Sequence, residues 1–207
     1  MSVTFEKTTY EGRQQAFWRG EAKILPSGYK LINSIAVGTL LTRGTFVHID
    51  TDNLEGAIVK VAKVVAGGTT AKPRIEKGSF IQAGDVMQVI GGTTTKTVVS
   101  IDRSNASYDV VDFGSALTGA TADAFIIESD GGTAASEGVE AVDPAPKYLP
   151  NAVLGADRKV EANDLVTLDV AYDVVVLKNV VPSFPASWLG EGGLVLANNP
   201  KIIFIHS

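Results

Sequence analysis

Short apolar runs separated by Gly-, Thr- and Asn-containing turns fill the chain from residue 34 onward. The segments from Thr45 to Asp50 and from Tyr108 to Phe113 alternate between apolar and polar residues, which is the pattern of a strand with one buried face. Other Val- and Ile-rich runs bounded by turn residues predict further strands. These lie at residues 34–41, 56–65, 86–90, 96–102, 124–128, 152–154, 165–170, 173–177 and 201–205.

The sequence predicts almost no helix. No segment of ~10 or more residues repeats its apolar positions with the period of an amphipathic helix, and Ser187 to Gly190 could make one helical turn at most. Residues 56–65 have mixed faces and could form a short helix, but their β-branched content favours a strand. A parallel sheet with crossover helices is therefore not expected. The predicted fold is mainly β: an antiparallel sandwich or barrel-like β domain with an extended N-terminal arm.

Residues 1–33 differ from the rest of the chain because they are polar and contain few core-forming residues. The adjacent aromatic residues Phe17 and Trp18 would be costly to leave in water, which favours an arm that packs on a neighbouring molecule. A poorly ordered terminus is the alternative. The candidate contact residues of this arm are Arg13, Phe17, Trp18 and Arg19.

Composition suggests three further segments. Residues 34–130 are expected to form a β domain. The strand pattern is lost over residues 131–150, where small residues and prolines predict a flexible linker or a long loop. Residues 151–207 are expected to form a C-terminal β segment that can pack into the same domain.

The formal net charge of −5 is unevenly distributed. Residues 1–30 carry a net charge of +2, residues 31–119 are balanced, and residues 120–173 carry −8. Because no basic segment could offset many phosphates, nucleic-acid binding is not expected. The acidic stretch is expected to face solvent and to repel neighbouring copies. No apolar run approaches the ~18–20 residues of a membrane helix and no signal peptide is recognisable, so we expect no membrane association.

The sequence offers little catalytic chemistry. Without cysteine, it has no disulfide, thiolate metal site or thiol nucleophile. Of the two histidines, His206 lies near the C-terminus, and His48 shares a predicted strand face with Asp50, as a general base and its orienting carboxylate would. A solvent-facing strand histidine is the more ordinary reading. The Gly-rich segments 67–70 and 91–96 lack the spacing of a phosphate-binding loop, and the acidic residues near Asp50 lack the calcium-loop pattern. We expect no enzyme activity, no metal and no cofactor.

Three stretches are distinctive as a set: residues 64–78, residues 148–157, and residues 176–182 together with residues 200–205. They resemble the head-fibre proteins encoded by tailed phages and prophages of gut bacteria, and the resemblance spans roughly residues 30–205. It implies a structural virion protein on the outer capsid surface, made in the bacterial host cytoplasm. It also implies a homotrimer whose partner is the major capsid protein, and it carries no catalytic residues onto this chain.

In that reading the N-terminal arm would anchor the protein and the acidic residues 120–173 would face outward. One alternative is a tail-tube or baseplate component, which would assemble into rings or tubes. Another is a carbohydrate-binding adhesion module, which needs exposed aromatic residues on a flat face. The aromatic candidates are scattered along the chain, which suggests core positions instead; they are Tyr108, Phe113, Tyr172 and Trp188.

Overall fold

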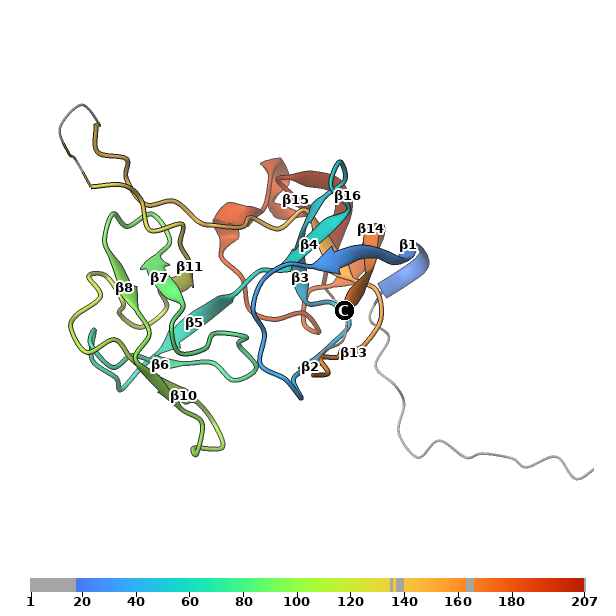
Figure 1. The fold of residues 1–207 in the computed structure, drawn as a ribbon. Coiled ribbons are helices and arrows are strands. Elements are labelled where there is room, and N and C mark those ends of the chain that lie inside the picture. The colour runs from blue at the N-terminus through green and yellow to red at the C-terminus, as the bar shows by residue number, and fades with distance from the viewer. Residues whose placement is uncertain (1–17, 135, 137–139, 163–165, 207) are drawn as a thin grey trace, which may run out of the picture.

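The computed structural model describes residues 18–134, 136, 140–162 and 166–206. It is nearly all β, with 44% strand and 3% helix, and it combines a five-stranded barrel with a curled half-barrel sheet. The predicted mainly β, barrel-like class is confirmed. Figure 1 shows the two parts beside each other; we call them the barrel lobe, at the right, and the half-barrel lobe, at the left.

The barrel lobe is a sheet that closes on itself. Its five strands follow the order β1 (Trp18–Leu31), β4 (Glu55–Ile58), β3 (Phe46–Asp50), β12 (Ala152–Leu154) and β14 (Thr167–Leu177), and β14 pairs back onto β1. The β1–β4 pairing is parallel and the other pairings of the barrel are antiparallel. Closure leaves these five strands without a free edge.

Shorter elements extend the barrel lobe. β16 (Asn199–Ile205) pairs in parallel with β14, and β15 (Val195–Leu196) pairs with β16. A separate ribbon joins β2 (Leu40–Leu41) to β13 (Arg158–Lys159). Single 3₁₀ turns at η1 (Ala186–Trp188) and η2 (Glu191–Gly193) lead into β15.

The half-barrel lobe is built from one continuous part of the chain. All of its strand pairings are antiparallel. Its strands follow the order β8 (Thr95–Thr97), β7 (Val86–Val89), β11 (Phe125–Glu128), β5 (Val61–Val65), β6 (Arg74–Ile75), β10 (Asp109–Asp112) and β9 (Ser100–Asp102).

The central barrel strands bury side chains on both faces, because one face lines the barrel interior and the other contributes to a second core. On β3, Val47 points into the barrel interior, whereas its neighbour Phe46 joins a second core between the lobes. β14 behaves in the same way, with Val170 in the interior core and its neighbour Ala171 in the second core. Side chains alternate between the faces of a strand, so one strand serves both cores.

The second core, which we call the shared core, joins the two lobes. It contains Val61 and Ile127 from the half-barrel lobe together with barrel residues. Phe46 is its centre: its ring centroid lies 5.1 Å from that of Phe184 and 5.3 Å from that of Trp188. Because both lobes bury apolar side chains in one cluster, they form a single packed unit.

The structure differs from the sequence-based prediction at the N-terminal arm. Residues 18–31, assigned to the arm 1–33, form β1 and close the barrel against β14 and β4. β1 contains Gly20 and Pro26, and its register with β14 shifts at three places. Such bulges let a long strand bend around a barrel. The rest of the predicted arm, residues 1–17, lies outside the described residues.

Several predicted strand boundaries also differ. Of residues 34–41 only Leu40–Leu41 form a strand, and the strand expected over residues 96–102 is two strands, β8 and β9, at opposite edges of the half-barrel sheet. The single strand expected over residues 56–65 is two strands, because the chain leaves the barrel at the end of β4 and enters the half-barrel sheet with β5. Conversely, residues 167–177 form one strand, β14, rather than two. The predicted C-terminal segment 151–207 packs into the barrel, since β12 and β14 are barrel strands.

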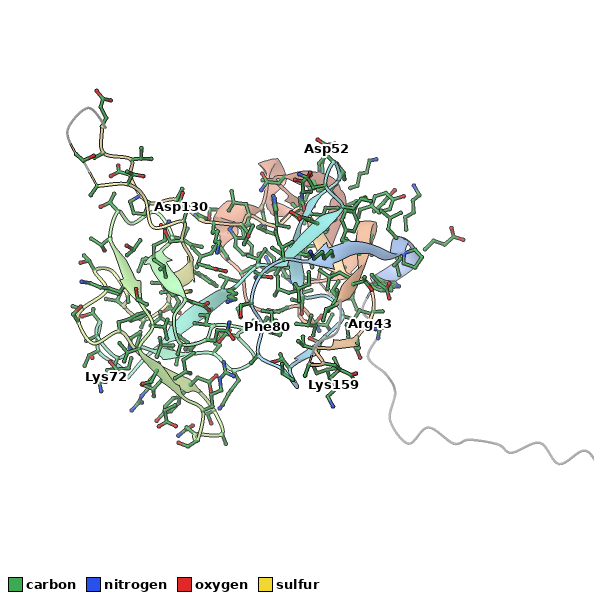
Figure 2. All side chains as sticks on the ribbon, viewed as in Figure 1. Arg43, Asp52, Lys72, Phe80, Asp130 and Lys159 are labelled. Atoms are coloured by element: carbon green, nitrogen blue, oxygen red, sulfur yellow. The ribbon has the colours of Figure 1, made fainter. Side chains whose placement is uncertain are left out.

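The segment 131–150, predicted as a linker or long loop, includes a loop that projects from the half-barrel lobe (Figure 1). Asp130 stands at its base (Figure 2), where its Oδ1 accepts hydrogen bonds from the amides of Gly132 and Ala145. Isolated bridges join Ser129 to Pro146 and Thr133 to Val142. Among the described residues, no helix has the length and apolar character needed to cross a membrane.

Candidate functional site

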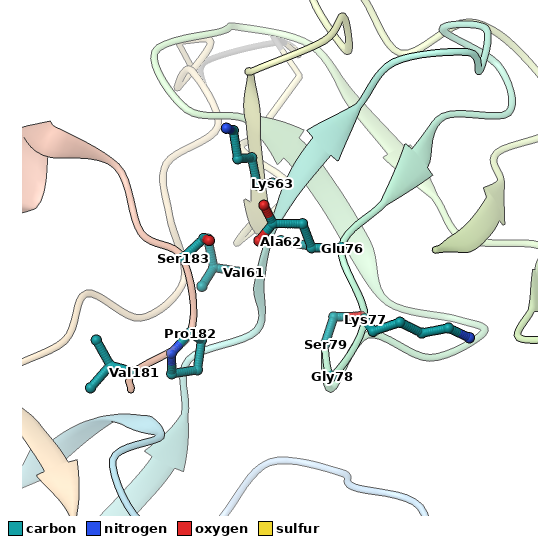
Figure 3. A pocket seen from close by; sticks show the side chains of 10 residues that line it. All are labelled: Val61, Ala62, Lys63, Glu76, Lys77, Gly78, Ser79, Val181, Pro182 and Ser183. Atoms are coloured by element: carbon teal, nitrogen blue, oxygen red, sulfur yellow. The ribbon is translucent and has the colours of Figure 1, made fainter. Parts of the chain in front are cut away.

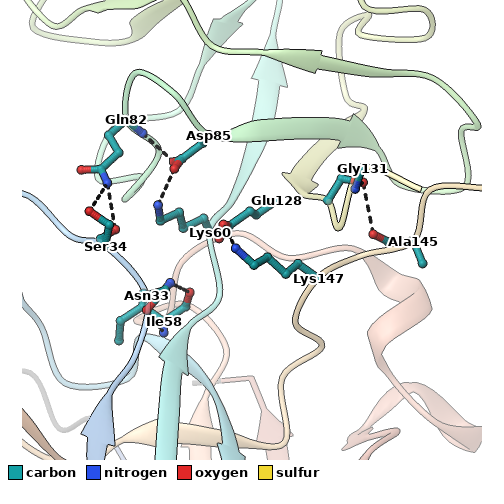
Figure 4. Close-up of polar contacts among 11 residues, drawn as sticks. Asn33, Ser34, Ile58, Lys60, Gln82, Asp85, Glu128, Gly131, Ala145 and Lys147 are labelled. Carbon is teal, nitrogen blue, oxygen red and sulfur yellow. Dashed lines mark hydrogen bonds and ion pairs between the residues drawn. The ribbon is translucent and has the colours of Figure 1, made fainter. Parts of the chain in front are cut away.

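Charged side chains are buried where the chain passes from one lobe to the other. Lys60 lies between β4 and β5, and its Nζ is 2.6 Å from Oδ1 of Asp85. The two side chains are only 1% and 9% exposed. Asp85 Oδ2 accepts a hydrogen bond from the backbone amide of Gln82 at 2.8 Å (Figure 4). Both carboxylate oxygens therefore have a donor, as a buried charge requires.

Glu128 adds a second carboxylate to this junction. Its amide donates to the carbonyl of Lys60 at 3.0 Å, which continues the β5–β11 register. Its Oε1 accepts a hydrogen bond from Lys147 Nζ at 3.0 Å. That bond raises the pKa of Lys147 above its ordinary value, against the opposing effect of burial. The other oxygen, Oε2, is buried without a hydrogen-bond partner.

Further polar contacts fasten the lobes around this cluster. The Asn33 side chain exchanges two hydrogen bonds with the backbone of Ile58, at 2.8 and 3.0 Å, and so takes the place of a missing strand partner. Gln82 Nε2 donates to the carbonyl and to the hydroxyl of Ser34 (Figure 4). We call Lys60, Asp85, Glu128 and Lys147 the junction cluster.

A groove runs beside the junction, between β5 and the segment 181–183 (Figure 3). It encloses about 240 Å³, and Lys63, Glu76, Ser79 and Pro182 are among its lining residues. Lys63 is already paired with Asp123 at 2.8 Å, and this hydrogen bond raises its pKa. The lining of the groove is more polar than apolar, and it also includes Lys77 and Ser183.

The sequence-predicted contact residues fall in different places. Trp18 begins β1 and is partly buried against the shared core, with the guanidinium carbon of Arg43 5.2 Å from its ring centroid. Arg19 follows it in β1. Arg13 and Phe17 lie outside the described residues. A contact between subunits through these residues stays a prediction, and for Trp18 it has to compete with contacts inside the barrel.

The contacts of the candidate residues His48 and Asp50 hold the local backbone and bring together no catalytic pair. His48 Nδ1 lies 2.8 Å from the carbonyl oxygen of Leu149, and His206 is exposed near the other end of the chain. Asp50 closes the turn that follows β3, and the hydrogen bond from the Asn53 side chain, followed by turn amides, lowers the Asp50 pKa. Within the described part of the chain, no group of three or more His, Asp or Glu residues could share a metal ion.

Two of the four aromatic candidates for carbohydrate binding are core residues. Phe113 and Trp188 are 4% and 6% exposed, in line with the core positions that their scatter suggested. Tyr108 lies beneath the guanidinium of Arg74, 4.4 Å from ring centroid to the guanidinium carbon. Tyr172 borders a hollow of about 400 Å³ that Tyr29 also lines.

Sequence reasoning missed the junction cluster. Lys60 falls inside the predicted strand 56–65, and Asp85 directly precedes the predicted strand 86–90. The available signal was the lysine itself, which interrupts the otherwise apolar run from Ala57 to Ala62. A lone charge inside such a run must be buried or must mark a break in the strand, and here it does both.

In comparisons with known proteins, no family model, no curated protein and no solved structure matched the chain. The resemblance to phage head fibres therefore stays a prediction from the residues that carry it.

Proposed function

We propose that this protein is a structural subunit that attaches to the outer surface of a tailed-phage capsid, as a head fibre or decoration protein. The resemblance carried by residues 64–78, 148–157 and 176–182 supports this proposal. The architecture also supports it, because two β lobes fused through a shared core hold surface side chains in fixed positions. The partner would be the major capsid protein, the subunit would act as a homotrimer on the virion, and the protein would have no enzymatic role.

The observation that carries the proposal is a set of exposed apolar side chains on one fastened segment, residues 32–40. Val37 is 65% exposed and Leu40 is 53% exposed. The segment is held by the side chain of Asn33 and by a 2.7 Å hydrogen bond from the amide of Gly38 to the carbonyl of Val160. We assign this segment to the binding surface because exposed apolar side chains that gather into a patch mark sites where another protein binds.

A sedimentation experiment tests this surface. Purified protein is mixed with capsids that lack it, and the bound fraction is measured in the pellet. The wild type should sediment with the capsids, and the double variant Val37→Ser/Leu40→Ser should lose most of its binding. Val99→Ser is the matched control, because Val99 is 62% exposed but lies in the half-barrel lobe. The same loss in all variants, or no binding by the wild type, would contradict the proposal.

The role of the N-terminal arm requires a shorter deletion than the sequence suggested. Removing residues 1–30 would delete nearly all of β1 and open the barrel, so loss of binding would only report unfolding. Removing residues 1–17 leaves every described strand in place. If the arm is the anchor, this variant should keep the wild-type circular dichroism spectrum and lose capsid binding. Retained binding would assign the anchor to the folded body.

The two alternatives are distinguished by other measurements. Light scattering on the purified protein should give a trimer for a head fibre, whereas rings or tubes would favour a tail component. A carbohydrate module is favoured only by the hollow beside Tyr172 and Tyr29. The amides that line this hollow are largely used by the fold: Asn151 exchanges two hydrogen bonds with the backbone of Ile49. Binding on a glycan array that is lost in Tyr172→Ala would revive this alternative.

A further inference from the structure

Three ionisable side chains of the junction cluster lie at the ends of adjacent strands of the half-barrel lobe: Lys60 directly precedes β5, Asp85 directly precedes β7, and Glu128 ends β11. β11 pairs with β5 on one side and with β7 on the other. Glu128 is opposite Lys60 in the first pairing and opposite Met87 in the second. Asp85 is two residues before Met87 and therefore shares its face. Residues opposite each other in an antiparallel pair also share a face, so Lys60, Glu128 and Asp85 converge on one side of the sheet.

Burial distinguishes this group from the other ion pairs. Lys23 and Asp173 are also 2.6 Å apart, but their side chains are 66% and 33% exposed and stay hydrated. For Lys60 and Asp85 the corresponding values are 1% and 9%. Lys60 and Asp85 are therefore held in contact away from water, with the nitrogen of one side chain beside the carboxyl group of the other.

We propose that Lys60 and Asp85 are joined by an intramolecular isopeptide bond that the protein forms on its own residues. In the proposed step one proton passes from Lys60 Nζ to Asp85 Oδ1, the resulting amine attacks Cγ of Asp85, the Nζ–Cγ bond forms, and the Cγ–Oδ1 bond breaks. Nitrogen gives up a proton, and Oδ1 leaves as water. An amine and an acid thus become an amide and one water molecule, with no change of oxidation state and no co-reactant.

The neighbouring groups fit the needs of this reaction. The amide of Gln82 donates to Oδ2, the oxygen that carries negative charge when the amine adds to Cγ. Oε2 of Glu128 is buried without a hydrogen-bond partner and makes no contact with Lys60 in this structure. In the proposed reaction the Glu128 side chain moves to Nζ, takes a proton from nitrogen and returns it to the departing Oδ1. Fixed contact between amine and acid supplies an effective concentration of about 10⁵–10⁸ M, which favours attack without an added catalyst.

Mass spectrometry of the denatured full-length protein is the first test, and it does not depend on the proposed capsid role. The intact mass should be lower than the sequence mass by one water molecule. A succinimide at the Asp130–Gly131 sequence would cause the same loss, so the site has to be mapped. Trypsin should fail to cleave after Lys60, and the peptides that contain Lys60 and Asp85 should be recovered as one branched species. Lys23 and Asp173 should remain in linear peptides, as the internal control.

An intact mass equal to the sequence mass, or a water loss that maps to Asp130, would overturn the proposal. Two variants sharpen it. Lys60→Arg keeps the positive charge and the ion pair but not the nucleophilic amine, so it should fold and show the full sequence mass. Glu128→Gln keeps the shape of the side chain, and it should slow bond formation by at least about 100-fold, the lower range for a general acid–base group. Complete bonding in Glu128→Gln at the wild-type rate would refute the role of Glu128.

Discussion

Phe46→Ala should destabilise both lobes although the residue belongs to the barrel. Phe46 is 1% exposed and has three aromatic neighbours, whose ring centroids lie 5.1, 5.3 and 6.1 Å away. A buried Phe→Ala substitution costs about 3–5 kcal/mol, and loss of these ring contacts places this one at the upper end. The total stability of a domain is about 5–15 kcal/mol, so much of it should be lost.

Two spectroscopic probes can test whether the shared core couples the lobes. The chain has two tryptophans, and both Trp18 and Trp188 lie at the shared core, so their fluorescence reports on that region. Far-UV circular dichroism reports on the strands of both lobes. In urea, the two probes should give one coincident transition for the wild type and for Phe46→Ala, with the midpoint of the variant strongly lowered.

A reciprocal variant completes the experiment. Met87 is fully buried in the core of the half-barrel lobe, away from both tryptophans. Met87→Ala should cost about 2–5 kcal/mol and should lower the fluorescence midpoint as much as the dichroism midpoint. If Met87→Ala shifts only the dichroism, or if Phe46→Ala leaves a second transition at the wild-type midpoint, the lobes unfold separately and the reasoning is refuted.

Three further predictions concern turns. Leu54 has a φ of 54° and is 59% exposed, so Leu54→Asn should raise the free energy of unfolding in urea by about 1 kcal/mol; no gain would show that Leu54 makes a stabilising contact. The hydrogen bond from the Asn53 side chain lowers the pKa of Asp50, so the ionised Asp50 stabilises the fold at pH values above its unfolded pKa of about 3.9, and this stability is lost as the pH falls through the lower folded pKa. Asp50→Asn should therefore make the free energy of unfolding depend less on pH in the acid range, and an unchanged dependence would contradict the assignment. A Cβ added to Gly68 would lie 2.6 Å from the backbone nitrogen of Arg74, whereas a Cβ added to Gly28 would meet no atom nearer than 3.6 Å. In thermal melts, Gly68→Ala should therefore lower the free energy of unfolding by about 1–3 kcal/mol, and Gly28→Ala should leave it nearly unchanged.

The local pattern of the sequence was sufficient to predict most of the strands. The alternation from residue 45 to 50 marks β3, and the short apolar run at 124–128 marks β11. β1 was missed because Gly20 and Pro26 interrupt its period, and bulges of this kind hide a strand from any test of alternation. The division of residues 56–65 was missed because periodicity does not record which sheet a strand joins.

The junction cluster could not be predicted from the sequence, for a different reason. Lys60 and Asp85 are 25 positions apart, and they meet only because β11, which comes later in the chain, lies between β5 and β7. Barrel closure also depends on residues far apart in the sequence, since it requires Trp18 to pair with Val176. Such long-range pairings are set by the packing of the whole chain, so a single sequence shows the residues but not their proximity.

The closed barrel also determines which part of the protein can fold first during synthesis on the ribosome. The half-barrel strands, from β5 to β11, are contiguous in the chain and can pair as soon as residue 128 has emerged. β1 is synthesised first, yet its main partner β14 ends at Leu177, and β16 follows later still. The earliest barrel strands therefore wait with uncovered apolar faces while the rest of the chain is made, the stage at which a nascent chain most needs protection from aggregation.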